Sequence, residues 1–173
     1  MILTIGHSTH PIDEFIRIGE AHGVATIVDV RTIPRSRHNP QFNRETLPAL
    51  LHAAGIEYIH IEGLGGLRHA RRDSVNTGWR NLSFRGFADY MQTPEFAAAL
   101  ERLIELSHAR RTAIMCSEAV PWRCHRSLIA DALSVRGIAV EHIMPAASRR
   151  PHTLTPFAHL DHADGDKISY TLP

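Results

Sequence analysis

The sequence predicts a three-layer α/β fold of the Rossmann or flavodoxin-like kind, with a mostly parallel five-stranded sheet and helices on both faces. Short apolar runs rich in β-branched residues recur along the chain and predict five strands, at 3–5, 25–30, 56–61, 112–116 and 138–143. Between them, apolar residues recur at helical spacing in 12–19, 47–51, 96–104 and 125–133. Strands that alternate with helices favour right-handed crossovers, and therefore a parallel sheet.

Proline and glycine support this division. Three prolines stand where helices are expected to begin and three glycines where helices are expected to end, namely Pro11, Pro94 and Pro121, then Gly23, Gly55 and Gly137. The stretches 31–43 and 62–85 lack either periodicity, and we expect them to be long loops that could form a lid. The tail, 148–173, shows little periodicity and is expected to wrap the surface as irregular chain.

Length and composition indicate an ordinary globular protein. The 173 residues suit one domain, 1–173, with a core at 2–145 and the irregular tail after it. The apolar fraction of 43% and the charged fraction of 21% argue against disorder, and no apolar run approaches the ~20 residues of a membrane span. The amino terminus resembles a first strand rather than a leader, so we expect a cytoplasmic protein. We expect no membrane partner and no cofactor, and the sequence leaves the oligomeric state open.

Positive charge is carried almost entirely by arginine. The chain has eighteen Arg and one Lys, Lys167, and its formal net charge is only +1. The net charge therefore gives no argument for a nucleic-acid partner. Many of the arginines cluster in 31–44, 68–85 and 123–126, and arginine suits bidentate binding of phosphate or carboxylate. A bias in genome composition would explain the total number of arginines but not the clusters.

Polar residues gather just after the predicted strands. In a parallel α/β sheet the ligand site lies beyond the carboxyl ends of the strands, so these positions are the candidates for function. They are His7 and Ser8 after the first strand, Asp29 and Arg31 after the second, Gly65 and Gly66 after the third, and Cys116 and Glu118 after the fourth.

The segment 115–126 is the richest in reactive side chains. If Cys116 ends a buried strand and a helix opens at Pro121, backbone N–H groups, Arg123 and Arg126 surround one concave spot that favours an anion. Such surroundings lower the pKa of a thiol. His125 shares a helical stripe with apolar residues and is expected to face the sheet near Cys116.

Several interpretations of the two cysteines stay open. Two cysteines are too few for a disulfide scaffold and, in a reducing compartment, are expected to be buried, reactive or metal-binding. The spacing from Cys116 to Arg123 is one residue too long for the loop of cysteine phosphatases. A zinc site of Cys116, Cys124 and His125, with Glu118 or His7, matches no standard spacing, and we expect no bound metal. Cys116 can also be a small buried core residue.

The remaining candidates have structural alternatives. Gly65 and Gly66 could form a nest of N–H donors, or a tight turn that needs positive φ. Asp29 and Arg31 could be an ion pair, or a catalytic acid and a substrate clamp. Ser8 could cap a helix, whereas His7 at a strand end is a better functional candidate.

Ordered motifs along 3–143 resemble those of the domain-of-unknown-function family 488. They are Thr4-Ile5-Gly6-His7-Ser8, Asp29-Val30-Arg31 with Pro34 and Ser36-Arg37, Leu64-Gly65-Gly66, Phe87-Ala88-Asp89-Tyr90-Met91, and Met115-Cys116 with Glu118, Pro121 and Cys124-His125-Arg126. The resemblance implies a compact, cytosolic α/β protein of bacteria or archaea without an established activity.

The leading hypothesis is an enzyme that acts on an anionic small molecule, nucleotide or nucleic-acid fragment. Cys116 is the candidate nucleophile or redox group, with His7 or His125 as its proton partner and Asp29 or Glu118 to orient the histidine. The candidate substrate contacts are Ser8, Arg31, Arg37, Gly65, Gly66, Cys124 and Arg126.

Two other classes of function remain. A noncatalytic nucleic-acid-binding module would use the arginine-rich loops on phosphates, with Trp79, Phe84 and Trp122 for base stacking. A partner-binding domain with a vestigial pocket is the third possibility.

Overall fold

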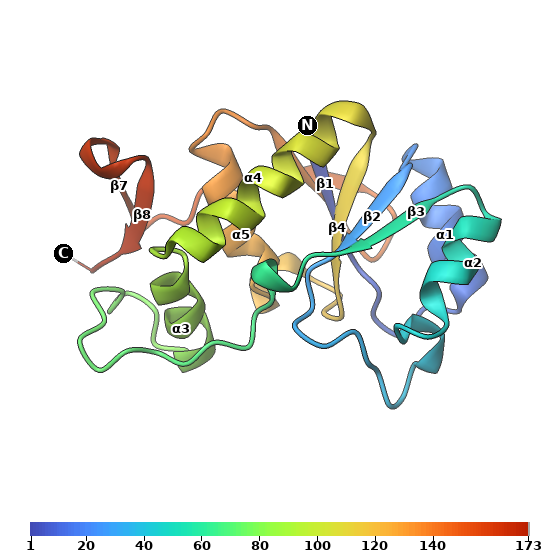
Figure 1. Cartoon of the computed structure of the whole chain (residues 1–173), viewed down its shortest axis with the longest axis horizontal. Helices are drawn as coiled ribbons and strands as arrows, with labels where there is room; N and C mark the ends of the chain where they lie inside the picture. Colours follow the sequence, from blue (N-terminus) through green and yellow to red (C-terminus); the bar gives the residue numbers. More distant parts are fainter. Residues whose placement is uncertain (173) are drawn as a thin grey trace.

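The computed structural model describes residues 1–172, which build a mixed sheet of six strands (Figure 1). The strands are β1 Ile2–Gly6, β2 Thr26–Asp29, β3 Glu57–His60, β4 Thr112–Cys116, β5 Val140–Ile143 and β6 Arg149–Pro151. Their order across the sheet is β3-β2-β4-β1-β5-β6, with the first five parallel and β6 antiparallel to β5. The α/β class and all five predicted strands are therefore confirmed.

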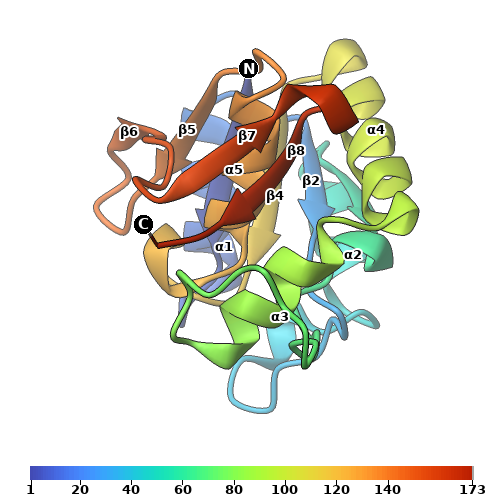
Figure 2. The same ribbon diagram turned by 90° about the vertical axis from the view of Figure 1, so that its left-hand side faces the viewer.

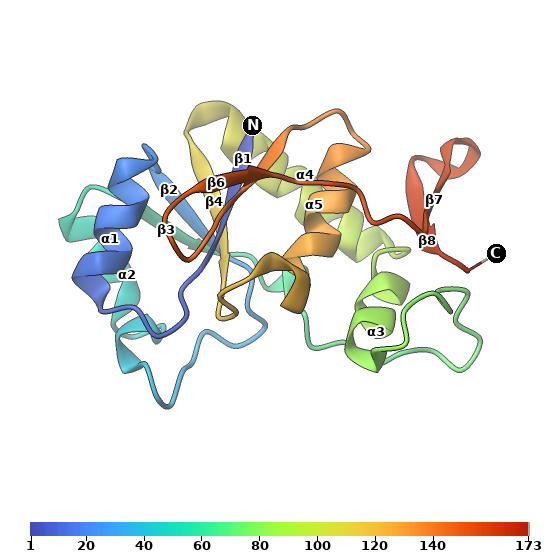
Figure 3. The ribbon, with the colours of Figure 1, turned by 180° about the vertical axis from the view of Figure 1, so that it is seen from behind.

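The predicted strand count was wrong by one, and the strand order is neither of the two doubly wound orders. The Rossmann order is 3-2-1-4-5-6 and the flavodoxin order 2-1-3-4-5, whereas here β4 lies between β1 and β2. The sixth strand runs along the edge of β5 (Figure 3). Its three residues, Arg149 to Pro151, are exposed and show no apolar alternation. They left no sequence signal, because an edge strand tolerates Pro and charge.

Helices cover both faces of the sheet. α1 (Ile12–Ala21) and α2 (Leu47–Ala53) lie on one face, and α3 (Leu82–Tyr90), α4 (Pro94–Ala109) and α5 (Arg126–Ser134) lie on the other (Figure 1). Alternate residues of β1 serve the two faces: Ile5 packs in the cluster that contains Phe15, and Ile2 packs in the cluster that contains Leu128.

One helix start differs from its prediction, and one helix was not predicted. Pro94 opens α4 as expected, but Pro121 begins only a 3₁₀ turn, and α5 starts at Arg126. α3 was not predicted, although it has a recognisable start signal: the side chain of Asn81 accepts hydrogen bonds from the backbone of Ser83 and Phe84.

The tail is ordered rather than irregular. β7 (Ala158–Asp161) and β8 (Lys167–Tyr170) form an antiparallel hairpin beside α3, on the helical side away from α1 and α2 (Figure 2). The buried carboxylate of Asp131 on α5 accepts hydrogen bonds from His152, Thr155 and Tyr170 of this tail. These contacts are long-range, so the local sequence did not indicate them.

The topology opens a crevice at the centre of the sheet. β4 and β1 are neighbours, but the chain leaves β1 through α1 on one face and leaves β4 through α5 on the other. Ligands of open α/β sheets bind beyond the carboxyl ends of the strands at such a divergence. The side chains near Gly6, Asp29 and Cys116, which end β1, β2 and β4, therefore define the place to look for a site.

Candidate functional site

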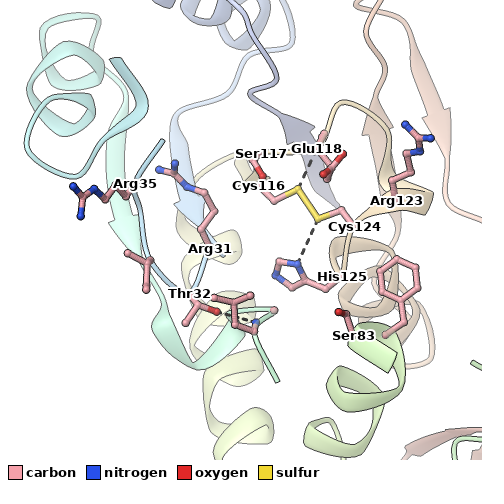
Figure 4. Close-up of a pocket in the computed structure, with 14 residues that line it drawn as sticks. Arg31, Thr32, Arg35, Ser83, Cys116, Ser117, Glu118, Arg123, Cys124 and His125 are labelled. Carbon is pink, nitrogen blue, oxygen red and sulfur yellow. Dashed lines mark hydrogen bonds between the residues drawn. A yellow bond between two sulfur atoms is a disulfide. The ribbon is translucent and has the colours of Figure 1, made fainter. Parts of the chain in front are cut away.

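A cavity of about 380 Å³ opens at this carboxyl edge (Figure 4). The loops after β2, β3 and β4 and the first turn of α3 provide its walls. The lining residues are Arg31, Thr32, Ile33, Arg35, Gly66, Leu67, Ser83, Phe84, Cys116, Ser117, Glu118, Arg123, Cys124 and His125. Six of the candidate catalytic and substrate-contact residues are therefore brought together: Arg31, Gly66, Cys116, Glu118, Cys124 and His125.

Cys116 and Cys124 form a disulfide on the wall of the cavity (Figure 4). Cys116 ends β4, Cys124 lies two residues before the start of α5, and their exposed fractions are 2% and 5%. The sequence expectation of two separate thiols is thus corrected, since in this structure Cys116 is bonded to Cys124. Within residues 1–172, no three His, Cys, Asp or Glu side chains converge as metal ligands would.

His125 contacts Cys124, not Cys116. Its Nε2 lies 2.8 Å from the carbonyl oxygen of Val30 and 3.0 Å from that of Leu64. Both partners can only accept, so Nε2 carries the hydrogen. In the neutral ring Nδ1 is then unprotonated, and it lies 3.4 Å from Cys124 Sγ. Burial lowers the pKa of His125 to about 4, so the ring is neutral at pH 7.

Gly66 is required by this ring. A Cβ at Gly66 would stand 2.6 Å from His125 Nδ1, so any side chain there would displace the imidazole. Gly65 has φ −66°, and its N–H donates to the carbonyl of Glu62. The two alternatives proposed for this pair, a positive-φ turn and a nest of free donors, therefore do not describe Gly65.

Arg126 is a buried cation behind the disulfide rather than a group facing the cavity. Its side chain is fully buried, its Nη2 donates to the carbonyl of Glu118 (2.8 Å), and its Nε and Nη1 have no partner in residues 1–172. Its backbone N–H points to Cys124 Sγ at 3.5 Å. Burial lowers the pKa of Arg126 to about 10, which leaves it charged at pH 7. Arg126 does not line the cavity, and its expected contact with substrate stays a prediction.

Glu118 acts here through its backbone. The same carbonyl oxygen lies 4.0 Å from Cys116 Sγ, and it would collide with a Cβ at Gly6, which explains the glycine at the end of β1. The carboxylate of Glu118 is exposed at the cavity, and carbonyl groups, not Glu118, orient His125.

Asp29 and Arg31 form the buried ion pair that the sequence allowed. Asp29 Oδ1 accepts from Arg31 Nε (2.9 Å) and Oδ2 accepts from Arg31 Nη2 (2.7 Å) and from the hydroxyl of Tyr58 (2.6 Å). Burial, with the charge of Asp29, raises the pKa of Tyr58 above its usual range. The carboxylate thus fixes the direction of the Arg31 side chain that lines the cavity.

His7 is buried beside this pair and is already fully engaged. Its Nδ1 donates to the carbonyl of Ser8 (2.8 Å), its Nε2 accepts from Arg31 Nη1 (3.4 Å), and its ring stacks on Phe42. Burial, assisted by Arg31, lowers the pKa of His7 to about 4. His7 therefore supports Arg31 and is not placed as the proton partner of Cys116.

Ser8 and Arg37, like Gly65 and Arg126, do not line the cavity, whereas Arg123, which was expected near an anion, and Arg35, which was not predicted, do. Ser8 adopts a left-handed backbone (φ 48°) and its N–H donates to Ser117, while Arg37 is exposed and does not line the cavity. Arg35 and Arg123 line it instead, both with exposed side chains. The arginine clusters pointed to the right loops, but loop geometry decides which arginine reaches the cavity.

The comparisons with known proteins give one match. The sequence profile described as domain of unknown function DUF488 matches residues 11–133. No curated protein and no solved structure matches the chain. In residues 1–172, no helix combines the length and apolar character that crossing a membrane requires. The matched range covers β2, β3 and β4 and all of the cavity-lining residues. The chain therefore belongs to the DUF488 family.

Proposed function

We propose that the protein is an enzyme that acts on an anionic small molecule, nucleotide or nucleic-acid fragment bound in this cavity. The observation that carries the proposal is the shared lining: three arginines, Arg31, Arg35 and Arg123, surround the same space as the cysteine pair and His125. Arginine is the side chain best suited to bidentate contact with phosphate or carboxylate.

The three arginines have different roles in this proposal. Arg31 is 7% exposed and held in place by Asp29, so it offers an anion a cation whose position is set before binding. Arg35 and Arg123 are exposed at the rim, where they attract an anion and adapt to it. This combination favours a small charged group bound deep in the cavity.

Apolar side chains complete the walls. Ile33, Leu67 and Phe84 line the cavity beside the arginines, and Ile33 and Leu67 are more than half exposed. Exposed apolar side chains beside a cavity are typical of ligand sites. They suit a ligand that carries an uncharged ring or chain next to its anionic group, as a nucleotide does.

The aromatic side chains argue against an extended stacking surface for single-stranded nucleic acid. Trp79 packs edge-on against Phe84 and Phe157 and contacts Tyr170, so it is part of an internal aromatic cluster. Among the three stacking candidates, only Trp122 is largely exposed, at 56%. A lone aromatic gives little support to the noncatalytic binding module.

Equilibrium binding of AMP tests the proposal, with adenosine as the uncharged control. We expect calorimetry to detect AMP binding that weakens with salt, and adenosine binding at least about tenfold weaker, because the anion provides most of the contacts. Arg123→Ala should weaken the affinity for AMP about three- to tenfold, because it removes one partly exposed charge contact. Arg37→Ala is the matched control and should leave the affinity for AMP unchanged. Absence of binding by AMP, phosphate and a short oligonucleotide at millimolar concentration would contradict the proposal.

A further inference from the structure

We propose that the Cys116–Cys124 disulfide is a redox centre that exchanges with a small anionic thiol, and that Cys124 is the sulfur released as thiolate. This activity goes beyond the proposed function, because it requires neither the substrate nor its turnover. It rests on how the two sulfurs are placed: they line the same cavity, but their polar neighbours differ.

The cavity gives a small thiol access to the bond. The disulfide is nearly buried as seen from bulk solvent, yet both cysteines form part of the cavity wall. Arg31 lies on the Cys116 side of the disulfide with its guanidinium directed away from the bond, and His125 points to Cys124 on the other side (Figure 4). A thiol that carries a carboxylate can therefore bind near Arg31 and approach Cys116 Sγ from the side opposite Cys124, in line with the S–S bond that breaks.

Cys124 is the better leaving group of the two. It precedes α5, a helix of nine residues, and the backbone N–H of Arg126 in the first turn points to its sulfur. His125 Nδ1 lies 3.4 Å from the same sulfur. The helix amino terminus and this backbone N–H stabilise a thiolate on Cys124. The unprotonated Nδ1 of His125 is placed to accept the proton of the Cys124 thiol. Cys116, at the end of a strand, has the carbonyl oxygen of Glu118 as its polar neighbour, and a carbonyl does not stabilise a negative charge.

Arg126 favours the reduced state. In the disulfide form its guanidinium is buried with two N–H groups unpartnered among residues 1–172, and its one side-chain bond goes to a neutral carbonyl. A buried cation without a counter-ion is unfavourable, and negative charge formed at the disulfide would lessen this cost, because the guanidinium and Cys116 Sγ both lie beside the carbonyl oxygen of Glu118. The acid that lines the cavity, Glu118, is exposed to solvent, where its opposing charge is screened. Stabilisation of the reduced form makes a disulfide more oxidising.

The exchange balances in two steps. A thiolate RS⁻ attacks Cys116 Sγ, an S–S bond to R forms, the Cys116–Cys124 bond breaks, and its electron pair stays on Cys124. A second thiolate attacks the sulfur of R in the mixed disulfide, which releases RSSR and the thiolate of Cys116. Two thiols are oxidised to one disulfide, and the protein disulfide gains two electrons. One thiol proton ends on Cys116, and the other is shared by Cys124 and Nδ1 of His125.

The rate of reduction of the native protein is the first test. Glutathione, which is anionic, should reduce the disulfide faster than the cationic thiol cysteamine after correction for their thiolate fractions. Arg123→Ala and Arg35→Ala should each slow reduction by glutathione about two- to fivefold. The rate of reduction by cysteamine should stay unchanged or increase. Arg37→Ala, an exposed arginine outside the cavity, is the matched control. A disulfide that glutathione reduces only in denaturant would overturn the proposal.

Single-cysteine variants test which sulfur carries the thiolate. Cys116→Ser leaves Cys124 free, and Cys124→Ser leaves Cys116 free. At pH 6 we expect iodoacetamide to alkylate Cys124 about tenfold or more faster than Cys116, because a pKa lowered by one unit gives about ten times more thiolate. Equal rates, or a faster Cys116, would refute the assignment of Cys124. Neither assay depends on AMP binding, so each proposal can fail without the other.

Discussion

Asp29 sets the position of the cavity arginine, and its removal should be costly. Breaking one partner of a buried ion pair leaves an uncompensated charge, so we expect Asp29→Asn to lower the free energy of unfolding by about 3–5 kcal/mol. Tyr58→Phe removes only one hydrogen bond to the same carboxylate and should cost about 1 kcal/mol. Urea unfolding at pH 7 measures both. Equal losses for the two variants would show that the carboxylate charge contributes little.

The sequence predicted side-chain contacts best where both partners stand at the end of the same strand. Asp29 and Arg31 follow the same strand, so their pairing depends only on local geometry. The side chain of Arg126 does not reach the cavity as expected, because its direction depends on where α5 begins. With the helix starting at Arg126 instead of Pro121, this side chain lies in the first turn and runs beneath Glu118. His125 is one residue earlier and reaches Val30 and Leu64, which no local pattern indicates.

At the scale of elements, the carboxylate of Asp131 ties the C-terminal segment to α5. Asp131 Oδ1 accepts from His152 Nε2, so a neutral His152 accepts at Nδ1 from His142 Nε2 (2.9 Å). His142 Nδ1 then accepts from the hydroxyl of Thr4 (2.7 Å). Thr155 and Tyr170 complete the contacts of Asp131. One carboxylate thus holds β6, the hairpin β7–β8 and β5 in register with α5.

We expect Asp131→Asn to loosen this segment. The amide nitrogen of Asn cannot accept a hydrogen bond. In place of Oδ2 it leaves the hydroxyls of Thr155 and Tyr170 without their acceptor, and in place of Oδ1 it does the same to His152 Nε2 and the backbone N–H of Thr155. Each buried group left without an acceptor costs about 1–3 kcal/mol. Limited proteolysis with mass spectrometry should show faster cleavage within 149–172 and no change in α1 or α2. Asp164→Asn, at an exposed ion pair, is the control. Unchanged cleavage of the tail would show that burial of Tyr170 is sufficient to hold it.

The strands that the sequence did not predict share a physical cause. β6, β7 and β8 have only three or four residues, and in β8 the buried Tyr170 makes contacts with distant parts of the chain, Asn76 and Asp131. Periodicity detects elements that bury one regular face, and the five core strands do so. Short elements held by single long-range hydrogen bonds carry no such period.

At the scale of the whole molecule, the α/β class and the carboxyl-edge location of the cavity follow from the alternation of elements, but the order of strands does not. The local sequence pattern predicts that a helix packed on the sheet follows each strand. It does not predict how many strands the connection crosses before the chain re-enters the sheet. The chain between β3 and β4 passes through α3 and α4, and this long connection lets β4 insert between β2 and β1. That insertion brings Cys116 beside Asp29 and Gly6, and thereby creates the cavity.

Three buried neutral histidines make the whole fold sensitive to acid. Burial lowers the pKa of His7 and of His125 to about 4, and burial with the neighbouring His152 lowers that of His142 to about 3. In the unfolded chain each histidine titrates near ~6.5. Between these values the unfolded state binds more protons than the folded state, so stability falls as the pH decreases from about 6.5 toward 4. Above about pH 7 all three are neutral in both states, and their contribution becomes constant.

The slope of this loss is the testable quantity. Three protons correspond to at most ~4 kcal/mol per pH unit, and we expect urea unfolding of the disulfide-bonded protein to approach this slope between pH 6 and pH 5. His142→Gln removes one titrating group and should reduce the slope by about a third, because His142 is the group most remote from the cavity and its loss leaves His7 and His125 in place. His38→Gln changes an exposed histidine in the loop after β2 and should leave the slope unchanged. A free energy of unfolding that stays level from pH 7 to pH 5 would mean that the three rings take up protons while folded, and the donor and acceptor assignments at His125 Nδ1 and His7 Nε2 would then be wrong.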